Sequence, residues 1–168
     1  MKRYYSWDDE DYIGGTTYIE IDDGYATKQI AITPNKYIAS NRKDKEHHFY
    51  LAEGLIDINE IIEYGGSEIS EKYFYGVWNA YKNTLINIWN ETKERFPLGN
   101  EIEGVIEVFY PQGIVITISQ DVIGITDYYK SSDSTNPKKL YPGHKIIGEV
   151  VSYDEENMWL VIDNTRVF

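Results

Sequence analysis

The residues of this sequence that could take part in catalysis are few and poorly placed for it. His47 and His48 are adjacent, so on an extended chain their side chains would point to opposite faces and could not readily share a metal ion. Either histidine could still pair with a distant carboxylate. Ser40 and Lys43 have the Ser-x-x-Lys spacing of some hydrolases, but they lie in a charged stretch without the helix start that this nucleophile requires.

No other catalytic motif is found. The sequence lacks a glycine-rich phosphate loop with its lysine, a His-Glu-x-x-His pair and a nucleophile elbow. We therefore predict that the protein is not an enzyme. The alternative that stays open is a pair of catalytic carboxylates distant in sequence.

Metal and cofactor sites are not indicated either. Asp8, Asp9, Glu10 and Asp11 form an acidic run, but the spaced ligands and the glycine of a calcium loop are missing. A solvated acidic loop is the simpler interpretation. Cysteine is absent, which excludes disulfides, thiolate metal sites and thiol catalysis. We expect no cofactor.

Composition and charge set the class of protein. The chain has 168 residues, of which 42% are hydrophobic and 15% aromatic, enough to bury a core. Its formal charge of -12 repels phosphate backbones and favours a basic partner. The N-terminus lacks the apolar run of a signal peptide, and no segment is apolar enough to span a membrane. We expect a cytoplasmic protein that does not bind membranes.

One long helix is predicted to connect two β-rich halves. Between Phe74 and Trp89 the apolar residues repeat at intervals of three and four, which is typical of a helix with one buried face. Ser70 is a good N-cap residue, and Pro97 disfavours helical geometry before it. The helix should span residues 70 to 96, with Trp78 and Trp89 buried between the two halves.

The N-terminal half, residues 1 to 69, is predicted to be a small antiparallel sheet with a short helix. Alternation indicates strands at 17–22, 25–33 and 37–40, the first two joined by a hairpin turn at Asp23 and Gly24. An extended segment follows near 49–52. Asp57 and Glu60 have capping-box spacing, which predicts a short helix closed by Gly65 and Gly66.

Part of this half resembles a known family. The segments YIEIDDGYATKQIAI, LAEGLIDINEI and SEISEKYFYGVW, within residues 17 to 78, are similar to a bacterial family of small domains of unknown function. That family is associated with toxin–immunity loci. The resemblance implies an immunity protein or an accessory protein encoded beside a toxin.

The C-terminal half, residues 97 to 168, is predicted to be a five-stranded barrel. Strand patterns cover 101–110, 113–119, 122–127, 144–153 and 158–163, and Gly148 suits a sharp bend in the fourth. The segments GNEIEGVIEVFYPQGIVITI, VIGITDYY and LYPGHKIIGEVVSYDEENMWLVI resemble an S1-like OB fold. That resemblance implies a binding platform formed by the second and third strands and their loops.

The RNA-binding residues of S1 domains are not retained here. By the resemblance to S1 domains, Gln112 and Val115 occupy the positions of the stacking aromatic residues, and Asp127 occupies the position of a histidine. The turn 154–157 is acidic where S1 domains often have basic residues. We therefore expect weak RNA binding or none, and a patch that contacts a protein instead. The candidate binding residues are Tyr110, Gln112, Asp127, Tyr128, Tyr129 and Asp133.

Together these observations predict an α+β protein with a β-sheet module, a connecting helix and an S1-like OB barrel. The leading hypothesis is a non-catalytic protein-binding module, of the immunity type, that neutralises a basic toxin. The alternative is an RNA-associated protein with an S1 or OB fold.

Overall fold

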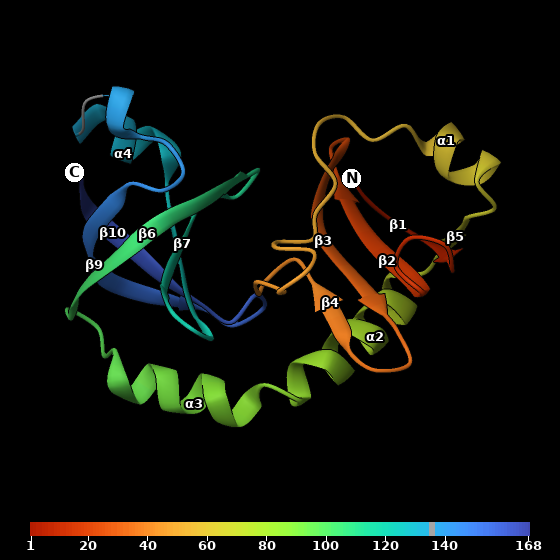
Figure 1. Cartoon of the computed structure of the whole chain (residues 1–168), viewed down its shortest axis with the longest axis horizontal. Coiled ribbons are helices and arrows are strands. Elements are labelled where there is room, and N and C mark those ends of the chain that lie inside the picture. The colour runs from red at the N-terminus through yellow and green to blue at the C-terminus, as the bar shows by residue number, and fades with distance from the viewer. Residues whose placement is uncertain (135–136) are drawn as a thin grey trace. The chain divides into compact units, whose positions relative to one another are not determined.

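The computed structural model describes residues 1–134 and 137–168, and the side chains of 133, 134 and 137 lie outside the described part. The chain divides into two compact units, Met1–Leu85 and Ile86–Phe168, called here the sheet unit and the barrel unit (Figure 1). Each has its own sheet and helices, which confirms the predicted α+β class. No helix among the described residues is long and apolar enough to cross a membrane.

The sheet unit is a five-stranded antiparallel sheet with two helices. Its elements along the chain are β1 (Lys2–Asp9), β2 (Gly15–Asp22), β3 (Tyr25–Ile32), β4 (Tyr37–Ala39), α1 (Ile58–Glu63), β5 (Ser67–Ile69) and α2 (Glu71–Asn83). Within the sheet the strands are hydrogen-bonded in the order β4-β3-β2-β1-β5. The hairpin between β2 and β3 turns at Asp23 and Gly24, whose φ angles of 52° and 88° are both positive, as such turns require. Asp57 caps α1, as predicted, by accepting a hydrogen bond from the Asn59 amide.

Two strands of this sheet were not predicted. β1 runs from Lys2 and pairs along its whole length with β2, so Asp8 and Asp9 belong to a strand rather than to a solvated loop. β5 is only three residues long and pairs with β1. The segment 49–52, which we expected to be extended, does not belong to any of the β-strands.

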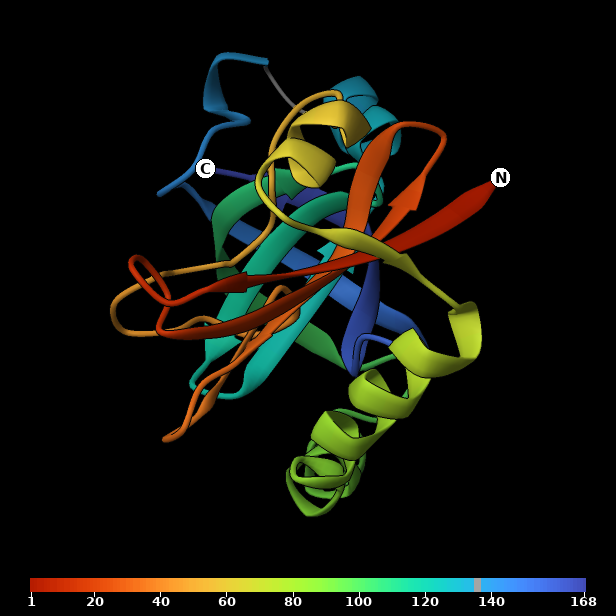
Figure 2. The same cartoon turned by 90° about the vertical axis from the view of Figure 1, so that its right-hand side faces the viewer.

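The sheet buries apolar side chains on both faces. On one face, Phe74, Trp78 and Tyr81 of α2 pack against Tyr4 and Ile30. The other face is covered by α1 and the segment before it, and its cluster consists of Tyr5, Ile19, Ile21 and Ala26 with Trp7, Leu51, Ala52, Ile56, Ile58 and Ile61 packed against them. Helices α1 and α2 therefore lie on opposite faces of the sheet, as Figures 1 and 2 show.

The predicted single helix over 70–96 is two helices, α2 and α3 (Ile86–Arg95). The break is at Thr84, whose hydroxyl donates to the Tyr81 carbonyl at 2.7 Å. The amides of Thr84 and Leu85 also bond to carbonyls three residues earlier, which tightens and ends the last turn of α2. Trp78 is therefore buried in the core of the sheet unit, whereas Trp89 is buried in the barrel unit.

The barrel unit contains a closed five-stranded barrel, consistent with the predicted OB fold. Its elements after α3 are β6 (Glu101–Tyr110), β7 (Gly113–Ser119), β8 (Val122–Thr126), α4 (Tyr128–Ser134), a 3-10 turn (Pro137–Lys139), β9 (Lys145–Asp154) and β10 (Trp159–Val167). The strand order around the barrel is β10-β8-β7-β6-β9, with β8 and β10 parallel. A Cβ on Gly148 would lie 2.5 Å from Ile162, so glycine permits this close packing of β9 and β10.

Candidate binding site

Five of the six predicted binding residues surround one hollow on the barrel unit. The register pairs Tyr110 with Gly113 across β6 and β7, and Ile114 with Thr126 across β7 and β8. This pairing brings the β6–β7 turn beside the start of α4. The hollow has a volume of about 240 Å³ and is lined by Phe109, Tyr110, Pro111, Gln112, Gly113, Asp127, Tyr128 and Tyr129.

Exposed aromatic rings dominate the lining. The exposed fractions of Phe109, Tyr128 and Tyr129 are 42%, 44% and 76%. The rings of Phe109 and Tyr128 meet edge to face at 5.9 Å between centroids, and those of Tyr128 and Tyr129 at 5.6 Å. Such edge-to-face contacts are favourable for aromatic pairs and hold the rings in defined orientations. The rings thus form a preorganised apolar contact surface.

Tyr110 differs from these three rings because it is half-buried. Its ring lies 6.1 Å from that of Trp159, which is buried in the barrel. Burial raises the pKa of the Tyr110 phenol far above its ordinary value, so the side chain stays neutral. Tyr110 therefore connects the hollow to the barrel core.

Asp127 has a structural role that the sequence analysis missed. Its Oδ1 accepts a hydrogen bond from the Lys130 amide at 2.9 Å, and its carbonyl accepts one from the Ser131 amide. This is the pattern of an N-cap residue at the start of α4. Residues 128–134 therefore form a short helix, which the strand patterns did not predict.

Helix α4 is held against the barrel by hydrogen bonds to β10. The buried Ser131 hydroxyl lies 2.7 Å from the hydroxyl of Thr165, and Lys130 Nζ lies 3.5 Å from Asp163. These contacts fix the helix that carries Tyr128 and Tyr129. The sixth predicted residue, Asp133, is in α4, but its side chain lies outside the described part of the structure.

The β9–β10 turn, which the S1 resemblance would place at an RNA contact, is bound to α3. Glu155 accepts hydrogen bonds from Trp89 Nε1 at 2.9 Å and from Lys93 Nζ at 2.6 Å. The Tyr153 hydroxyl donates to the Phe96 carbonyl at 2.8 Å. Glu155 is thus used within the barrel unit, and this turn is not a free binding loop.

None of the three positions compared with S1 domains carries an aromatic ring. Val115 is buried, and Gln112 is exposed at the hollow. Lysine and arginine do not occur among the lining residues that the structure describes, and the only carboxylate among them is that of Asp127. Proteins that bind single-stranded nucleic acids combine stacking rings with a positively charged groove, and this hollow provides only the rings.

The other candidate groups from the sequence have local structural roles. His47 Nδ1 lies 3.1 Å from Asp44 Oδ2, and Asp44 also accepts a hydrogen bond from Lys36 Nζ at 2.9 Å. Burial alone would raise the pKa of Asp44, but hydrogen bonds, first among them those from Lys36 and His47, hold it far below its usual value. The buried Ser40 hydroxyl accepts from the Gln29 amide.

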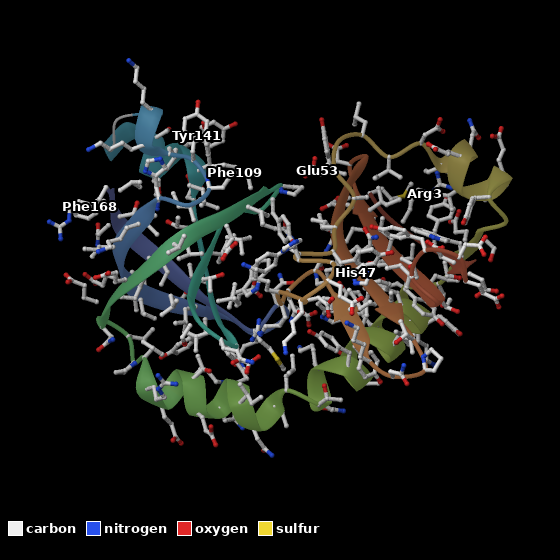
Figure 3. All side chains as sticks on the ribbon, viewed as in Figure 1. Arg3, His47, Glu53, Phe109, Tyr141 and Phe168 are labelled. Carbon is white, nitrogen blue, oxygen red and sulfur yellow. The ribbon has the colours of Figure 1, made fainter. Side chains whose placement is uncertain are left out.

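Phe109 is the lining residue with a large exposed ring that sequence reasoning missed. Alternation along the strand would place its side chain on the face opposite that of Tyr110. Its position just before a turn that contains proline was the one sequence feature that could have indicated an exposed site. Figure 3 labels Phe109 on the barrel unit.

No family model and no curated protein matches this chain. The geometry and the charge of the site therefore carry the functional proposal.

Proposed function

We propose that this protein is a non-catalytic binding module that recognises a basic protein partner through the aromatic hollow of its barrel unit. The observation that carries this proposal is the set of three exposed rings beside a hollow in which the one charged residue, among those that the structure describes, is a carboxylate. Aromatic side chains are common anchors at protein interfaces. A net charge of -12 also speeds encounter with a positively charged protein.

The barrel topology supports the finer assignment to an S1-like OB fold. Three consecutive strands, β6, β7 and β8, are neighbours, and the fifth strand lies between the third and the fourth. This is a five-stranded Greek-key arrangement, as in OB folds, which bind ligands through the second and third strands and adjoining loops. The hollow lies at such loops.

We propose more specifically that the protein acts in the cytoplasm as an immunity protein. A protein that neutralises a basic toxin, such as a nuclease, needs a surface complementary to one that binds nucleic acid. Acidic charge combined with exposed aromatic rings meets that need. The resemblance noted in the sequence analysis for residues 17 to 78 implies the same role.

The alternative is an RNA-associated protein, favoured by the exposed rings on an OB-like barrel. Titration of labelled single-stranded RNA separates the two functions. We expect no sub-micromolar binding at near-physiological salt, because none of the described residues that line the hollow is a cation that could contact phosphate. Tight binding that weakens steeply with salt would favour the RNA function.

The direct test uses the product of the adjoining gene as the candidate partner. We expect Phe109→Ala and Tyr129→Ala each to weaken its binding by about 1 kcal/mol or more, measured by calorimetry. Tyr141→Ala is the matched control, because Tyr141 is also an exposed tyrosine of the barrel unit, 57% exposed, but does not line the hollow. Equal affinities for all three variants would remove the hollow as the contact surface. Failure of the wild-type protein to bind the adjoining product would remove the immunity-type role.

A further inference from the structure

A second concave surface lies on the sheet unit, between the sheet and the segment that includes α1. This groove has a volume of about 620 Å³. Trp7, Ile56 and Ile61 contribute apolar side chains that also pack against the core of this face. Leu55 and Tyr64 line it as well, although they are 73% and 59% exposed. The groove therefore offers apolar surface that the sheet unit itself leaves open.

Carboxylates surround this apolar surface. Five acidic residues line the groove, and no lysine or arginine does so among the described residues: Asp9, Glu53, Asp57, Glu60 and Glu63. Glu53 is labelled in Figure 3, on the segment before α1. The sequence around them has the same bias, because residues 46–71 include seven acidic residues and no lysine or arginine.

Only two of these five carboxylates have a role in the fold. Asp9 accepts a hydrogen bond from the Tyr12 amide, and Asp57 caps α1. The side chains of Glu53, Glu60 and Glu63 are exposed, and no described residue forms an ion pair or hydrogen bond with them. Three other acidic residues of this unit are paired with basic ones, in the contacts Arg3–Glu68, Lys28–Glu20 and Lys36–Asp44.

Unpaired like charges around an apolar groove favour a ligand that is apolar in the middle and positive at its edges. A single metal ion does not fit this description, because no three acidic or histidine side chains among the described residues are grouped as metal ligands. Positive charges spaced along a polypeptide match carboxylates spaced along a groove. An amphipathic helix supplies both features, since its apolar face fits a groove while lysine and arginine flank it.

We propose that this groove of the sheet unit binds a basic amphipathic helix of a partner protein. The inference rests on the proposed function as a protein-binding module and adds a second contact surface to it. Apolar side chains of the helix contact Trp7, Leu55 and Ile61, and its lysine or arginine side chains pair with Glu53, Glu60 and Glu63.

The test uses the full chain and a synthetic probe. The probe is a fluorescein-labelled peptide of about fourteen residues, with leucines on one helical face and lysines beside them. Binding is followed by fluorescence anisotropy. We expect saturable binding that weakens as salt is raised and that is lost when glutamate replaces every lysine of the peptide.

Charge reversal locates the site. The double variant Glu60→Lys, Glu63→Lys should raise the Kd for the peptide at least about tenfold. The matched control is Glu91→Lys, Glu94→Lys on α3, which makes the same change in net charge at two exposed residues of another helix. The control should change the Kd less than about twofold. Leu55→Ala should also weaken binding, because Leu55 is an exposed apolar residue of the groove.

Two results would overturn the inference: no saturable binding of the lysine peptide, or equal losses in the groove pair and in the α3 pair. The second result would mean that the peptide responds only to net charge. Because the probe does not require the natural partner, this outcome is independent of the barrel test. Peptide binding that is intact in Tyr129→Ala, together with partner binding that is also intact, would reject the barrel hollow and keep the groove.

Discussion

The two units carry the same net charge but use their acidic residues differently. The sheet unit has nine basic and fifteen acidic residues, and the barrel unit has seven and thirteen, so each carries -6. At the barrel, Asp127 caps a helix and Glu155 holds α3. In the sheet unit, Glu20 is buried in a network of its own, whereas Glu60 and Glu63 have no described partner.

The comparison shows that net charge alone does not locate a binding surface for a basic partner. A carboxylate that already caps a helix or accepts several hydrogen bonds contributes to the long-range field, but it is not free to form a new pair. Carboxylates with no role in the fold can do both. By this criterion, our proposals assign the aromatic anchors to the barrel hollow and the charged contacts to the groove of the sheet unit.

The largest expected effect concerns the assignment of α2 to the sheet unit. Trp78 is fully buried and stacks on Phe74 at 6.1 Å between ring centroids. Trp78→Ala should reduce the free energy of unfolding by about 3–5 kcal/mol, because it leaves a large cavity in a close-packed core. Amide hydrogen exchange in β2 and β3 measures this loss. Unchanged protection there would show that α2 does not hold the sheet.

The break between α2 and α3 shows why the sequence predicted one helix where the structure has two. The apolar spacing continues through Tyr81, Leu85 and Ile88, so periodicity alone predicts one helix. The break depends on the Thr84 hydroxyl and on two tight backbone hydrogen bonds, which periodicity does not register. The apolar residues of α2 are buried in the core of the sheet unit and those of α3 in the barrel unit, and only the tertiary contacts show this division.

Strand prediction succeeded where turns were clearly marked. The predicted ranges 101–110 and 113–119 match β6 and β7, because Pro111 and Gln112 separate two strand-forming segments and Gly113 begins the second. β1 was missed because its tyrosines, tryptophan and charged residues do not alternate simply. β5 is too short for any periodic signal.

The second expected effect concerns a carboxylate that the fold does use. Glu20 is fully buried and accepts hydrogen bonds from Tyr4, Tyr75, Thr27 and Lys28. Glu20→Gln should cost about 2 kcal/mol of unfolding free energy, since it leaves the buried Lys28 ammonium without its counter-charge. Urea denaturation at neutral pH measures the difference.

The pH dependence of this difference checks its electrostatic origin. Burial alone would raise the pKa of Glu20, but hydrogen bonds from Tyr75 and Thr27 and the charge of Lys28 lower it below its ordinary value. The unfolded pKa is about 4.3, so the stabilisation is complete above about pH 5 and is lost as pH falls through the lower folded pKa. The gap between wild type and Glu20→Gln should close in acid. A gap that is constant with pH would assign the loss to packing.

Glu68→Gln is the matched control, because Glu68 also accepts hydrogen bonds from a tyrosine and a basic residue, Tyr5 and Arg3. Glu68 is exposed, so solvent screens the pair and the variant should change stability far less than Glu20→Gln. Equal effects would mean that burial does not distinguish the two carboxylates.

The candidate site was predictable in its location but not in the roles of its residues. Tyr110, Gln112, Asp127, Tyr128 and Tyr129 do surround one hollow, because β6, β7 and β8, whose ranges were predicted closely, are neighbours in the barrel. The capping role of Asp127 was missed because Asp127 follows a strand directly and α4 is only seven residues long, too short for a periodic pattern.

The smallest expected effect separates the two roles of Asp127. Asp127→Ala should destabilise α4 by about 1 kcal/mol, because the Lys130 amide loses its acceptor. Asp127→Asn removes the charge but keeps a good N-cap, so α4 should stay intact. Amide hydrogen exchange of Lys130 and Ser131 measures the cap. If Asn and Ala increase this exchange equally, the carboxylate charge, and not the cap, holds the start of α4.

The rate of association with a basic partner measures the other role of Asp127. Asp127→Asn should slow association only slightly, because one exposed charge is a small part of a net charge of -12 and the rings that anchor the contact stay in place. Asp127→Ala should mainly speed dissociation, since Tyr128 and Tyr129 are carried by the helix that this residue caps. An equally large fall in the association rate for both variants would make Asp127 a direct contact of the partner. The barrel hollow, and not only the groove of the sheet unit, would then offer a carboxylate that can pair with a basic partner.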